Sequence, residues 1–389
     1  MHKNKAVVVG GSSGVGLAIS SLLIRSKWNV VIIDRELLPD EAGLPMESVE
    51  YFYSDLLNYN DDLFAQLAQD GDIKCLFIAA GIGRVCLFEH LHIAEIEKTL
   101  TINSLAAMKI LKQFYKRIRS DEEFYCGVMC SISGHVSSPA FSVYAASKAA
   151  VCRFVESVNA ELEYEGVKNR VLDVSPGSIG GTRFYGSDET RLDQLEPLAK
   201  DILMALLRHD NLLIPDYEDT YKEVLDRYQA DPRKFGLQSA EYKMASSRID
   251  NRATAKIGYL SGTFDLFHIG HLNLLKRAKR ACDYLVVGVH PSGAWKGKET
   301  FIPFEERKEI LRAIRCVDKV IDAPDEDSDA WETVGYNLLF VGSDYQGTDR
   351  FKRYEVELGA KGVRIIYFPY TQTTSSTELR RAIKDSFSR

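Results

Sequence analysis

Tyr144 and Lys148 are four residues apart, a spacing that places a phenol and an ammonium group on one face of a helix. A free phenol has a pKa of about 10, and a nearby cation lowers that pKa because it favours the phenolate. Tyr144 could then act as general acid in ketone reduction or as general base in alcohol oxidation. The same spacing is common on solvated helix faces, so the pair alone leaves a structural interpretation open.

A glycine-rich turn near the N-terminus predicts a dinucleotide site. Residues 7–16 have the pattern of a buried strand, a tight turn and a helix start, where backbone N–H groups can approach a pyrophosphate. Asp34 stands about twenty residues after the turn, where a carboxylate binds the ribose 2′-OH of NAD and repels a 2′-phosphate. Arg35 partly offsets that preference, and a glycine-rich turn can also be only a turn. The candidates here are Gly10, Ser12, Ser13, Gly14, Val15, Gly16, Asp34 and Arg35.

A second strand-to-helix turn carries two imidazoles. His268 and His271 are three residues apart, with Gly270 between them, in the expected first turn of a helix. Helix N-termini attract anions, and the imidazoles there can donate hydrogen bonds to phosphate oxygens as charge develops during displacement at phosphorus. Two alternatives are a zinc site, for which no third ligand stands nearby in register, and a pair of core histidines.

The first half of the chain resembles the short-chain dehydrogenase/reductase family over residues 3–240, because the glycine-rich loop, Asn103, Ser131 and the Y-x-x-x-K pair occur in the family's order. The resemblance implies that Ser131 polarises a substrate carbonyl, Tyr144 transfers the proton, Lys148 holds the nicotinamide ribose and Asn103 supports a proton-relay water. It also implies an adenine contact and a nicotinamide loop, in which Thr182 contacts the carboxamide. These further cofactor candidates are Asp55, Ala80, Gly81, Pro176, Gly177, Ile179 and Thr182.

The second half resembles the HxGH cytidylyltransferases, in particular the glycerol-3-phosphate cytidylyltransferases, over residues 256–387. The resemblance implies that His268 and His271 stabilise the transferring α-phosphoryl group of CTP. It also implies that two mobile lysines neutralise the triphosphate, although a solvated loop would explain these lysines equally well. A later Ser-Ser-Thr run is expected to hold pyrophosphate, and Arg307 and Asp344 are expected to support the base end or the pocket wall. The CTP and substrate candidates are Gly262, Thr263, Phe264, His268, His271, Lys296, Lys298, Arg307, Gly342, Asp344, Thr371, Ser375, Ser376 and Thr377.

Both halves depart from their families. In the first, Val9 replaces a Thr, and Ala79 replaces the Asn of the family's N-A-G segment. The loop before Thr182 is also one residue longer than in the family. In the second, Tyr370 replaces an Arg, and the family's acceptor-binding Lys is missing after Trp331 and Glu332. Because charge-assisted contacts are the strong ones, these losses predict an acceptor other than glycerol 3-phosphate, or contacts supplied by the first half.

The expected elements form two α/β domains. A chain of 389 residues exceeds the roughly 250 to 300 residues of a single core. Buried strands alternating with helices predict doubly wound parallel sheets, a Rossmann-fold reductase at 1–250 and a smaller HUP-type nucleotidyltransferase at 251–389. Residues 217–255 are polar and are broken by a proline. The strands are expected at 6–9, 30–34, 76–79, 127–131, 171–174, 256–260, 284–289, 338–342 and 363–367, with helices at 270–281, 304–315 and 376–386.

Composition excludes several other classes of protein. A formal charge of −6 gives no global attraction to nucleic acid, and no apolar run is long enough to span a bilayer. The seven cysteines are odd in number and include no C-x-x-C, which argues against a disulfide framework and a zinc site, so no metal ligands are assigned. We therefore expect a cytoplasmic protein without membrane or nucleic-acid partners. The family resemblance also implies a homo-oligomer.

Together these features predict a bifunctional enzyme. It would reduce a phosphorylated ketose or similar sugar phosphate with NAD(P)H, then transfer CMP from CTP, with Mg²⁺, to the resulting alditol phosphate. A CDP-alditol of this kind would serve surface polysaccharide synthesis such as capsule formation. Two alternatives are a transferase regulated by a non-catalytic nucleotide-binding domain, and two active domains with unrelated substrates.

Overall fold

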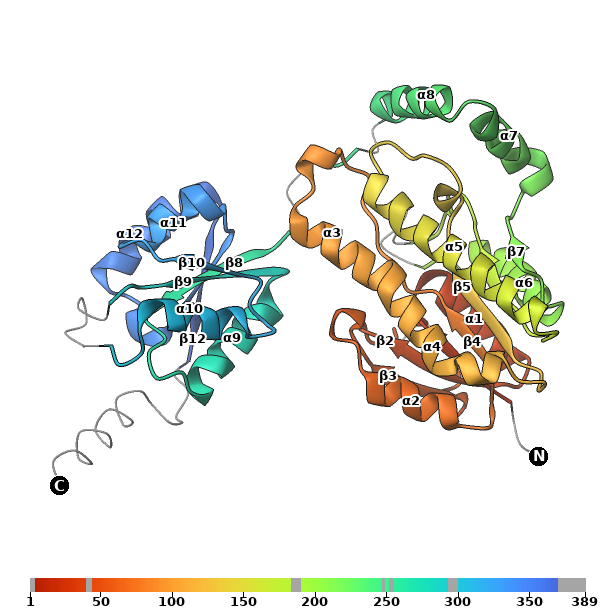
Figure 1. The fold of residues 1–389 in the computed structure, drawn as a ribbon, viewed down its shortest axis with the longest axis horizontal. Helices are drawn as coiled ribbons and strands as arrows, with labels where there is room; N and C mark the ends of the chain where they lie inside the picture. The colour runs from red at the N-terminus through yellow and green to blue at the C-terminus, as the bar shows by residue number, and fades with distance from the viewer. Residues whose placement is uncertain are drawn as a thin grey trace. The chain divides into compact units, whose positions relative to one another are not determined.

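The computed structural model describes residues 4–39, 44–182, 190–246, 249–251, 255–292 and 300–369. The chain divides into two compact units, Met1–Arg252 and Ala253–Arg389, and each is built on one parallel sheet (Figure 1). The predicted fold class, two parallel-sheet α/β domains, is confirmed. Among the described residues, no helix combines the length and apolarity needed to cross a membrane.

The first unit contains a seven-stranded sheet in the order β3-β2-β1-β4-β5-β6-β7. The order reverses between β1 and β4, and ligands of such sheets bind beyond the carboxyl ends of the strands at this switch point. Strand β5 ends at Met129, so the expected strand over 127–131 is shorter at its end, and Ser131 lies in the following turn. The strands are β1 (Lys5–Val9), β2 (Asn29–Asp34), β3 (Val49–Tyr53), β4 (Ile73–Ile78), β5 (Tyr125–Met129), β6 (Val171–Val174) and β7 (Leu212–Leu213).

Helices cover both faces of this sheet because its strands are apolar on both sides. One core joins β-strand side chains to α2, α4 and α5, and the other joins them to α1 and α6. The helices are α1 (Gly14–Arg25), α2 (Asp61–Gln69), α3 (Ile93–Leu100), α4 (Ala106–Ile118), α5 (Ser142–Tyr164), α6 (Leu192–Leu207), α7 (Lys222–Ala230) and α8 (Pro232–Ala245).

The polar segment after β7 is mostly helical. A π-helical turn over Tyr217–Tyr221 leads into α7, and Asp231 then caps α8 by accepting a hydrogen bond from the backbone N–H of Lys234. Pro232 stands at the first position of α8, where its missing N–H costs nothing. The proline that breaks the sequence pattern therefore marks a boundary between two helices.

The second unit contains a five-stranded sheet in the order β10-β9-β8-β11-β12, with apolar cores on both faces. The helix expected over 304–315 ends at Arg312, and the helix expected over 376–386 lies outside the described residues. Strand β10 and helices α11 and α12 were not predicted, because they are short and largely polar. The elements are β8 (Ile257–Gly262), α9 (Ile269–Ala281), β9 (Tyr284–Val289), α10 (Phe304–Arg312), β10 (Lys319–Asp322), α11 (Asp327–Val334), β11 (Leu338–Gly342), α12 (Asp349–Glu357) and β12 (Arg364–Phe368).

Candidate active sites

The four catalytic candidates of the first unit meet beyond the carboxyl ends of β4 and β5. Asn103 lies in a π-helical turn, Thr101–Leu105, at the start of α4, and π-turns inside helices often mark functional sites. The Asn103 side chain accepts a hydrogen bond from Ile82 N at 2.8 Å and donates to Ile82 O and to Ser147 Oγ. Asn103 therefore connects the loop after β4 to helix α5, which carries Tyr144 and Lys148.

Lys148 is completely buried and points toward the same loop. Its Nζ donates to the backbone oxygen of Met129, the last residue of β5, at 2.6 Å. A methyl group at Gly81 would lie 3.2 Å from Nζ and 3.5 Å from Asn103 Oδ1. A side chain at Gly81 would thus crowd the Lys148 ammonium, whereas its contact with Asn103 would be an ordinary one.

Tyr144 corrects one expectation from the sequence. Its hydroxyl group was expected to have a lowered pKa, but burial raises the pKa of Tyr144 to about 12, and the hydrogen bond with Ser131 only partly opposes this effect. Burial also lowers the pKa of Lys148, whose Nζ is 5.8 Å from the centre of the Tyr144 ring. Desolvation therefore outweighs the neighbouring cation, and Tyr144 is a protonated phenol near neutral pH.

Ser131 and Phe141 complete the surroundings of Tyr144. Ser131 caps the short turn Ile132–Gly134 by accepting a hydrogen bond from Ser133 N, and its side chain is buried. The rings of Phe141 and Tyr144 are stacked, with centres 4.1 Å apart. Together these contacts orient the phenol toward the Ser131 hydroxyl, in the arrangement expected for a carbonyl held by two donors.

The glycine-rich loop has the geometry expected of a phosphate-binding turn. Gly10 has a φ of +81°, and a Cβ there would lie 2.6 Å from the backbone nitrogen of Ala80. Helix α1 begins at Gly14, and the side chain of its N-cap residue, Ser13, makes no capping hydrogen bond. The first N–H groups of α1 near Val15 and Gly16 are therefore suited to an anion, except that Gly14 N donates to Thr190 Oγ1.

The remaining cofactor candidates lie around this loop. Asp34 Oδ2 accepts hydrogen bonds from the backbone nitrogen and the hydroxyl of Ser12, at 3.0 and 2.6 Å. Arg35 is exposed and lies 3.9 Å from the carboxylate of Glu36, which weakens its expected effect on a 2′-phosphate. Asp55 caps the turn after β3 through Leu57 N. The Asp34 carboxylate is thus the charged group placed directly on the glycine loop.

The loop after β6 lies between the cofactor turn and helix α7. Thr182 donates to Ile179 O at 3.1 Å, and a Cβ at Gly14 would lie 3.7 Å from the Thr182 methyl carbon. Gly177 follows Pro176 and packs directly against the Tyr221 ring, leaving no room for a Cβ. These contacts place Thr182 beside the glycine loop, and they connect the segment 176–179 to the start of α7.

In the second unit, the two histidines stand where helix α9 begins. His268 is the N-cap, and its Nδ1 accepts a hydrogen bond from Gly270 N at 3.1 Å. The proton of a neutral His268 must therefore be on Nε2, which is buried and has no hydrogen-bond partner among the described residues. The His271 ring stacks on it with centres 4.0 Å apart, and its Nδ1 is likewise unpaired.

Burial lowers the pKa of both imidazoles, and the pKa of His271 falls to about 4 through burial and the neighbouring His268. Both rings are therefore neutral near pH 7, so they can stabilise a phosphoryl group through N–H donation. An unpaired buried donor costs roughly 1–3 kcal/mol, and a bound phosphate oxygen would remove that cost.

The loop before α9 is held in a strained form. Phe264 and Leu266 have φ values of +51° and +50°, which cost non-glycine residues on the order of 1–3 kcal/mol each. Asp265 is buried and accepts hydrogen bonds from the backbone nitrogens of Phe301 and Ile302. The Phe264 ring contacts His271 edge-on at 5.4 Å. Asp265, to which no role was assigned from sequence, therefore joins the histidine loop to the start of α10.

Arg307 is held by backbone groups of the surrounding loops. Its guanidinium is almost fully buried and donates to the backbone oxygens of Thr263, His290, Pro291 and Ile302. All of these hydrogen bonds are to the protein's own backbone, so Arg307 holds these loops together. Its expected roles at the base end or in the pocket wall stay predictions.

The remaining candidate residues of the second unit lie at strand ends or outside the described residues. Gly262 ends β8 and Gly342 ends the adjacent β11, and Asp344 follows in an exposed turn that packs against Gly342. Sequence reasoning missed Ser261, which donates to the buried carboxylate of Asp327 at 2.6 Å. A polar residue inside an apolar strand was its only signal. Lys296, Lys298, Thr371, Ser375, Ser376 and Thr377 lie outside the described residues.

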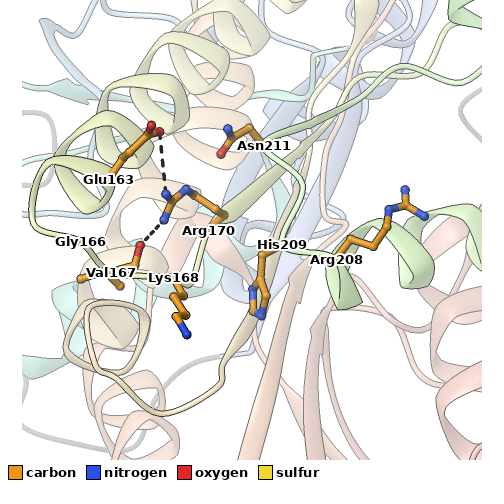
Figure 2. Close-up of a pocket in the computed structure, with 8 residues that line it drawn as sticks. All are labelled: Glu163, Gly166, Val167, Lys168, Arg170, Arg208, His209 and Asn211. Carbon is orange, nitrogen blue, oxygen red and sulfur yellow. Dashed lines mark hydrogen bonds and ion pairs between the residues drawn. The ribbon is translucent and has the colours of Figure 1, made fainter.

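A surface hollow in the first unit lies at the opposite edge of its sheet (Figure 2). It is formed where α5 leads into β6 and α6 leads into β7, which is the amino-terminal edge of the strands. Arg170 is paired there with Glu163, with 3.8 Å between the charged atoms. Because the candidate catalytic residues lie at the carboxyl edge, this hollow is not part of their site.

Comparison with known proteins gives a separate result for each unit. Residues 4–191 match the family model for short chain dehydrogenase, and residues 259–382 match the model described as cytidylyltransferase-like. A glycerol-3-phosphate cytidylyltransferase of Bacillus subtilis is 36% identical over 126 residues, which are 31% of this chain and 92% of that protein.

The relatives of the first unit are more distant. An uncharacterized oxidoreductase of Saccharomyces cerevisiae is 26% identical over 189 residues, covering 46% of this chain and 61% of that protein. The crystal structure of a Burkholderia cenocepacia short chain dehydrogenase in complex with NADP aligns with a TM-score of 0.50 at 21% identity. The alignment covers 61% of this chain and 98% of that one, and it supports the fold of the first unit.

Proposed function

Because this chain is an enzyme that joins a short-chain dehydrogenase/reductase unit to a unit of the cytidylyltransferase family, we propose that the two units act in sequence. The first reduces the carbonyl of a phosphorylated ketose or similar sugar phosphate. The second transfers CMP from CTP to the phosphate of the alditol phosphate so formed. The products are a CDP-alditol and pyrophosphate. The enzyme would act in the cytoplasm, and the CDP-alditol would serve surface polysaccharide synthesis.

The protonated state of Tyr144 carries the first step. In reduction, a nicotinamide cofactor supplies the hydride for the carbonyl carbon, and the carbonyl oxygen requires a proton. Burial raises the pKa of Tyr144 to about 12, so this phenol holds a proton at neutral pH and can donate it. Ser131 can donate a second hydrogen bond to the same oxygen, and Lys148 stabilises the phenolate that remains. These states favour reduction over alcohol oxidation near neutrality.

The cofactor would bind along the glycine-rich loop. The N–H groups at the start of α1 would hold the pyrophosphate, and Asp55 would contact the adenine. Ala80, Gly81 and Thr182 would contact the nicotinamide half. Asp34 accepts two hydrogen bonds from Ser12 and places a negative charge on this loop. That charge favours NADH over NADPH, because a carboxylate accepts from the ribose 2′-OH and repels a 2′-phosphate.

Replacing Asp34 with Asn is expected to shift cofactor preference toward NADPH. The amide keeps an oxygen that can accept from Ser12 but loses the negative charge, so the repulsion of a 2′-phosphate disappears. We expect the ratio of kcat/KM for NADH to that for NADPH to fall by about tenfold or more, as for the loss of one charge-assisted hydrogen bond. Steady-state kinetics with both cofactors measure this ratio. Arg35→Ser, which removes the cation expected to offset this preference, should not lower the ratio. An unchanged ratio in Asp34→Asn would contradict the role of the carboxylate.

An anionic substrate has a cation available near Tyr144. Lys243 on α8 donates to Ser138 Oγ at 2.6 Å and to Pro139 O at 2.9 Å, and its Nζ lies 5.7 Å from the centre of the Phe141 ring. Phe141 in turn stacks on Tyr144. The third ammonium proton has no acceptor among the described residues. We propose that this proton and the charge of Lys243 bind the substrate phosphate.

This role predicts a pH dependence of substrate binding. Burial lowers the pKa of Lys243 to about 8, so its charge is present below pH 8 and is lost as the pH rises above it. The KM for a phosphorylated substrate should therefore rise above pH 8, while the KM for its unphosphorylated analogue should not. A Lys243→Met variant should show a KM raised by roughly tenfold at pH 7, without the rise above pH 8. Equal pH profiles in wild type and variant would contradict it.

The unpaired imidazole donors carry the second step. A phosphate oxygen of the acceptor attacks the α-phosphorus of CTP, and the bond to the β-phosphate oxygen breaks to release pyrophosphate. His268 Nε2–H and the neutral His271 would donate hydrogen bonds to the α-phosphoryl oxygens as their charge increases. Mg²⁺ would neutralise the triphosphate, and Lys296, Lys298 and the run Ser375, Ser376 and Thr377 would bind its remaining charge.

The acceptor is proposed to differ from glycerol 3-phosphate. Trp331 and Glu332 are contacted by Lys361, whose Nζ is 2.7 Å from the Glu332 carboxylate and 4.0 Å from the centre of the Trp331 ring. These residues end α11, which leads into the amino-terminal end of β11, whereas His268 follows the carboxyl end of the parallel neighbour β8. Lys361 therefore does not replace the missing acceptor lysine.

A single assay tests the coupled function. The full chain would be supplied with CTP, Mg²⁺, NADH or NADPH and a panel of ketose phosphates, and the products would be separated and identified by mass. We expect a CDP-alditol whose formation requires both the nicotinamide cofactor and CTP. CMP transfer to a supplied alditol phosphate without any reduction across the panel would contradict the coupling, and it would favour a regulatory role for the first unit. Reduction of substrates whose products are not CMP acceptors would favour two unrelated activities.

A further inference from the structure

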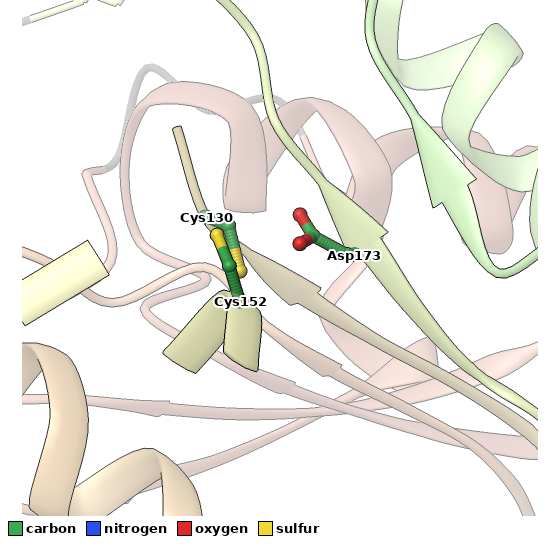
Figure 3. Close-up of side chains that lie close together, drawn as sticks. All are labelled: Cys130, Cys152 and Asp173. Atoms are coloured by element: carbon green, nitrogen blue, oxygen red, sulfur yellow. The ribbon is translucent and has the colours of Figure 1, made fainter. Parts of the chain in front are cut away.

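Four side chains with metal-binding chemistry converge behind the catalytic residues of the first unit. The thiol sulfurs of Cys130 and Cys152 and a carboxylate oxygen of Asp173 all lie within 4.8 Å of one another. His135 lies at the edge of this group: its Nε2 is 3.6 Å from the Cys152 sulfur and 3.8 Å from Asp173 Oδ2, and it forms a hydrogen bond with Ser175 Oγ at 2.9 Å. Figure 3 shows the two cysteine side chains next to each other, with the Asp173 carboxylate directed toward them.

These groups are buried, and the mechanism proposed above does not use them. Cys130, Cys152 and Asp173 are at most 5% exposed, and both cysteines belong to an apolar core. Burying a carboxylate and an imidazole in such surroundings is costly unless they are paired or bind a metal. Burial raises the pKa of Asp173 to about 6, and hydrogen bonds from Cys130 and His135 lower the pKa of the Cys152 thiol.

Two distances from His135 are close to those between the ligands of a tetrahedral ion. Zinc binds sulfur at about 2.3 Å and nitrogen or oxygen at about 2.0–2.2 Å, so its tetrahedral ligand atoms lie roughly 3.3–3.8 Å apart. The sulfur-to-nitrogen distance of 3.6 Å falls in this range, and the nitrogen-to-oxygen distance of 3.8 Å is at its edge. The ligand atoms of Cys130, Cys152 and Asp173 lie within 4.8 Å of one another. Two thiolates, one imidazole and one carboxylate supply four ligands of the types zinc prefers.

Neighbouring groups support such a site. Ser175 Oγ donates to Asp173 Oδ1 at 2.6 Å, which leaves Oδ2 to face His135 and the cysteines. Ser175 Oγ also lies 2.9 Å from His135 Nε2, and zinc would replace that hydrogen bond. A hydrogen bond of this kind orients a ligating carboxylate. Zinc with two thiolates and one carboxylate has a net charge of −1, and the buried ammonium of Lys148 lies one helical turn before Cys152. The negative charge of the cluster would thus partly compensate the positive charge buried at Lys148.

We propose that Cys130, His135, Cys152 and Asp173 form a structural zinc site. The ion would connect the end of β5, the turn after Ser131, helix α5 and strand β6. Cys130 is adjacent to Ser131, and Cys152 is four residues after Lys148, so the site would fix the two elements that carry the catalytic groups. All four ligand positions would be filled by protein, which is typical of structural and not catalytic zinc.

Cobalt substitution of the full chain tests the proposal. The protein would be reduced, treated with a chelator and titrated with Co²⁺ without oxygen, and then Zn²⁺ would be added. We expect a thiolate-to-cobalt charge-transfer band and the visible bands of tetrahedral Co²⁺, saturating at one ion per chain and lost when Zn²⁺ displaces cobalt. Zn²⁺ should also raise Tm, because an ion that binds the folded state stabilises it.

Two variants and a matched control locate the ion. Cys152→Ser, which preserves shape, and Asp173→Asn should each weaken cobalt binding at least tenfold and reduce the Tm gain from zinc, since loss of even an outer hydrogen-bond partner of a metal ligand costs about tenfold or more. Cys126→Ala removes an equally buried thiol from the same strand region and should retain both signals. Absence of a thiolate band in wild type, its persistence in Cys152→Ser, or oxidation of Cys130 and Cys152 to a disulfide with no metal uptake after reduction would each overturn the proposal.

Discussion

Replacing Tyr144 with Phe is expected to lower kcat/KM for carbonyl reduction by about 10²–10⁴, the usual contribution of a positioned general acid. The ring would still stack on Phe141, so the packing that holds α5 should change little. Only the proton donor is lost, together with the hydrogen bond to Ser131. Oxidation of NADH or NADPH followed by absorbance, with the best substrate of the panel, measures the effect.

Two further measurements separate chemistry from folding. Tyr164→Phe changes an exposed tyrosine at the end of the same helix and should leave reduction unchanged. CMP transfer to a supplied alditol phosphate should be equal in wild type and Tyr144→Phe, since the histidine site is in the other unit. If Tyr144→Phe reduces the substrate at the wild-type rate, the phenol is not the proton donor.

Replacing His268 with Ala is expected to lower kcat for CMP transfer by about 10²–10³, as for the loss of one preorganised donor to a developing negative charge. Its Nε2–H is buried and has no partner among the described residues, so a phosphoryl oxygen would be its natural acceptor. Release of pyrophosphate from CTP in the presence of an alditol phosphate measures the rate. Carbonyl reduction should be unaffected.

His268 also caps helix α9, so a second variant is needed to separate the two roles. Asn is a good N-cap and can accept the hydrogen bond from Gly270 N, but its amide does not reach the position of Nε2. His268→Asn should therefore keep the Tm of the wild type while CMP transfer stays low. Recovery of full turnover in His268→Asn would show that the cap, and not the imidazole donor, is what catalysis needs.

Much of the fold could be predicted from the sequence. Apolar runs and glycine-rich turns are local signals, so strands such as β9 and β11 and the starts of α1 and α9 lie where the pattern placed them. The family motifs likewise identified both units of the chain. Short polar elements such as β10 and α12 carried too weak a pattern to be found, because long-range packing stabilises them.

The burial and the hydrogen-bond partners of the site residues could be learned only from the tertiary structure. The sequence showed that Tyr144 and Lys148 share a helix face, but only the fold showed how deeply both are buried, and burial reversed the expected direction of the Tyr144 pKa. Sequence also could not show that Arg307 contacts four backbone oxygens, because those oxygens come from three separate loops.

The sequence by itself determined the two families, the two parallel sheets and the residue types at each active site, because these depend on short patterns along the chain. Only the tertiary structure decided which distant groups meet. Cys130 and Cys152 are 22 residues apart and Asp173 lies 21 residues further on, so no short spacing announces the cluster. They converge because β5, α5 and β6 are consecutive parts of one right-handed crossover, which brings the ends of two parallel strands beside the helix that connects them.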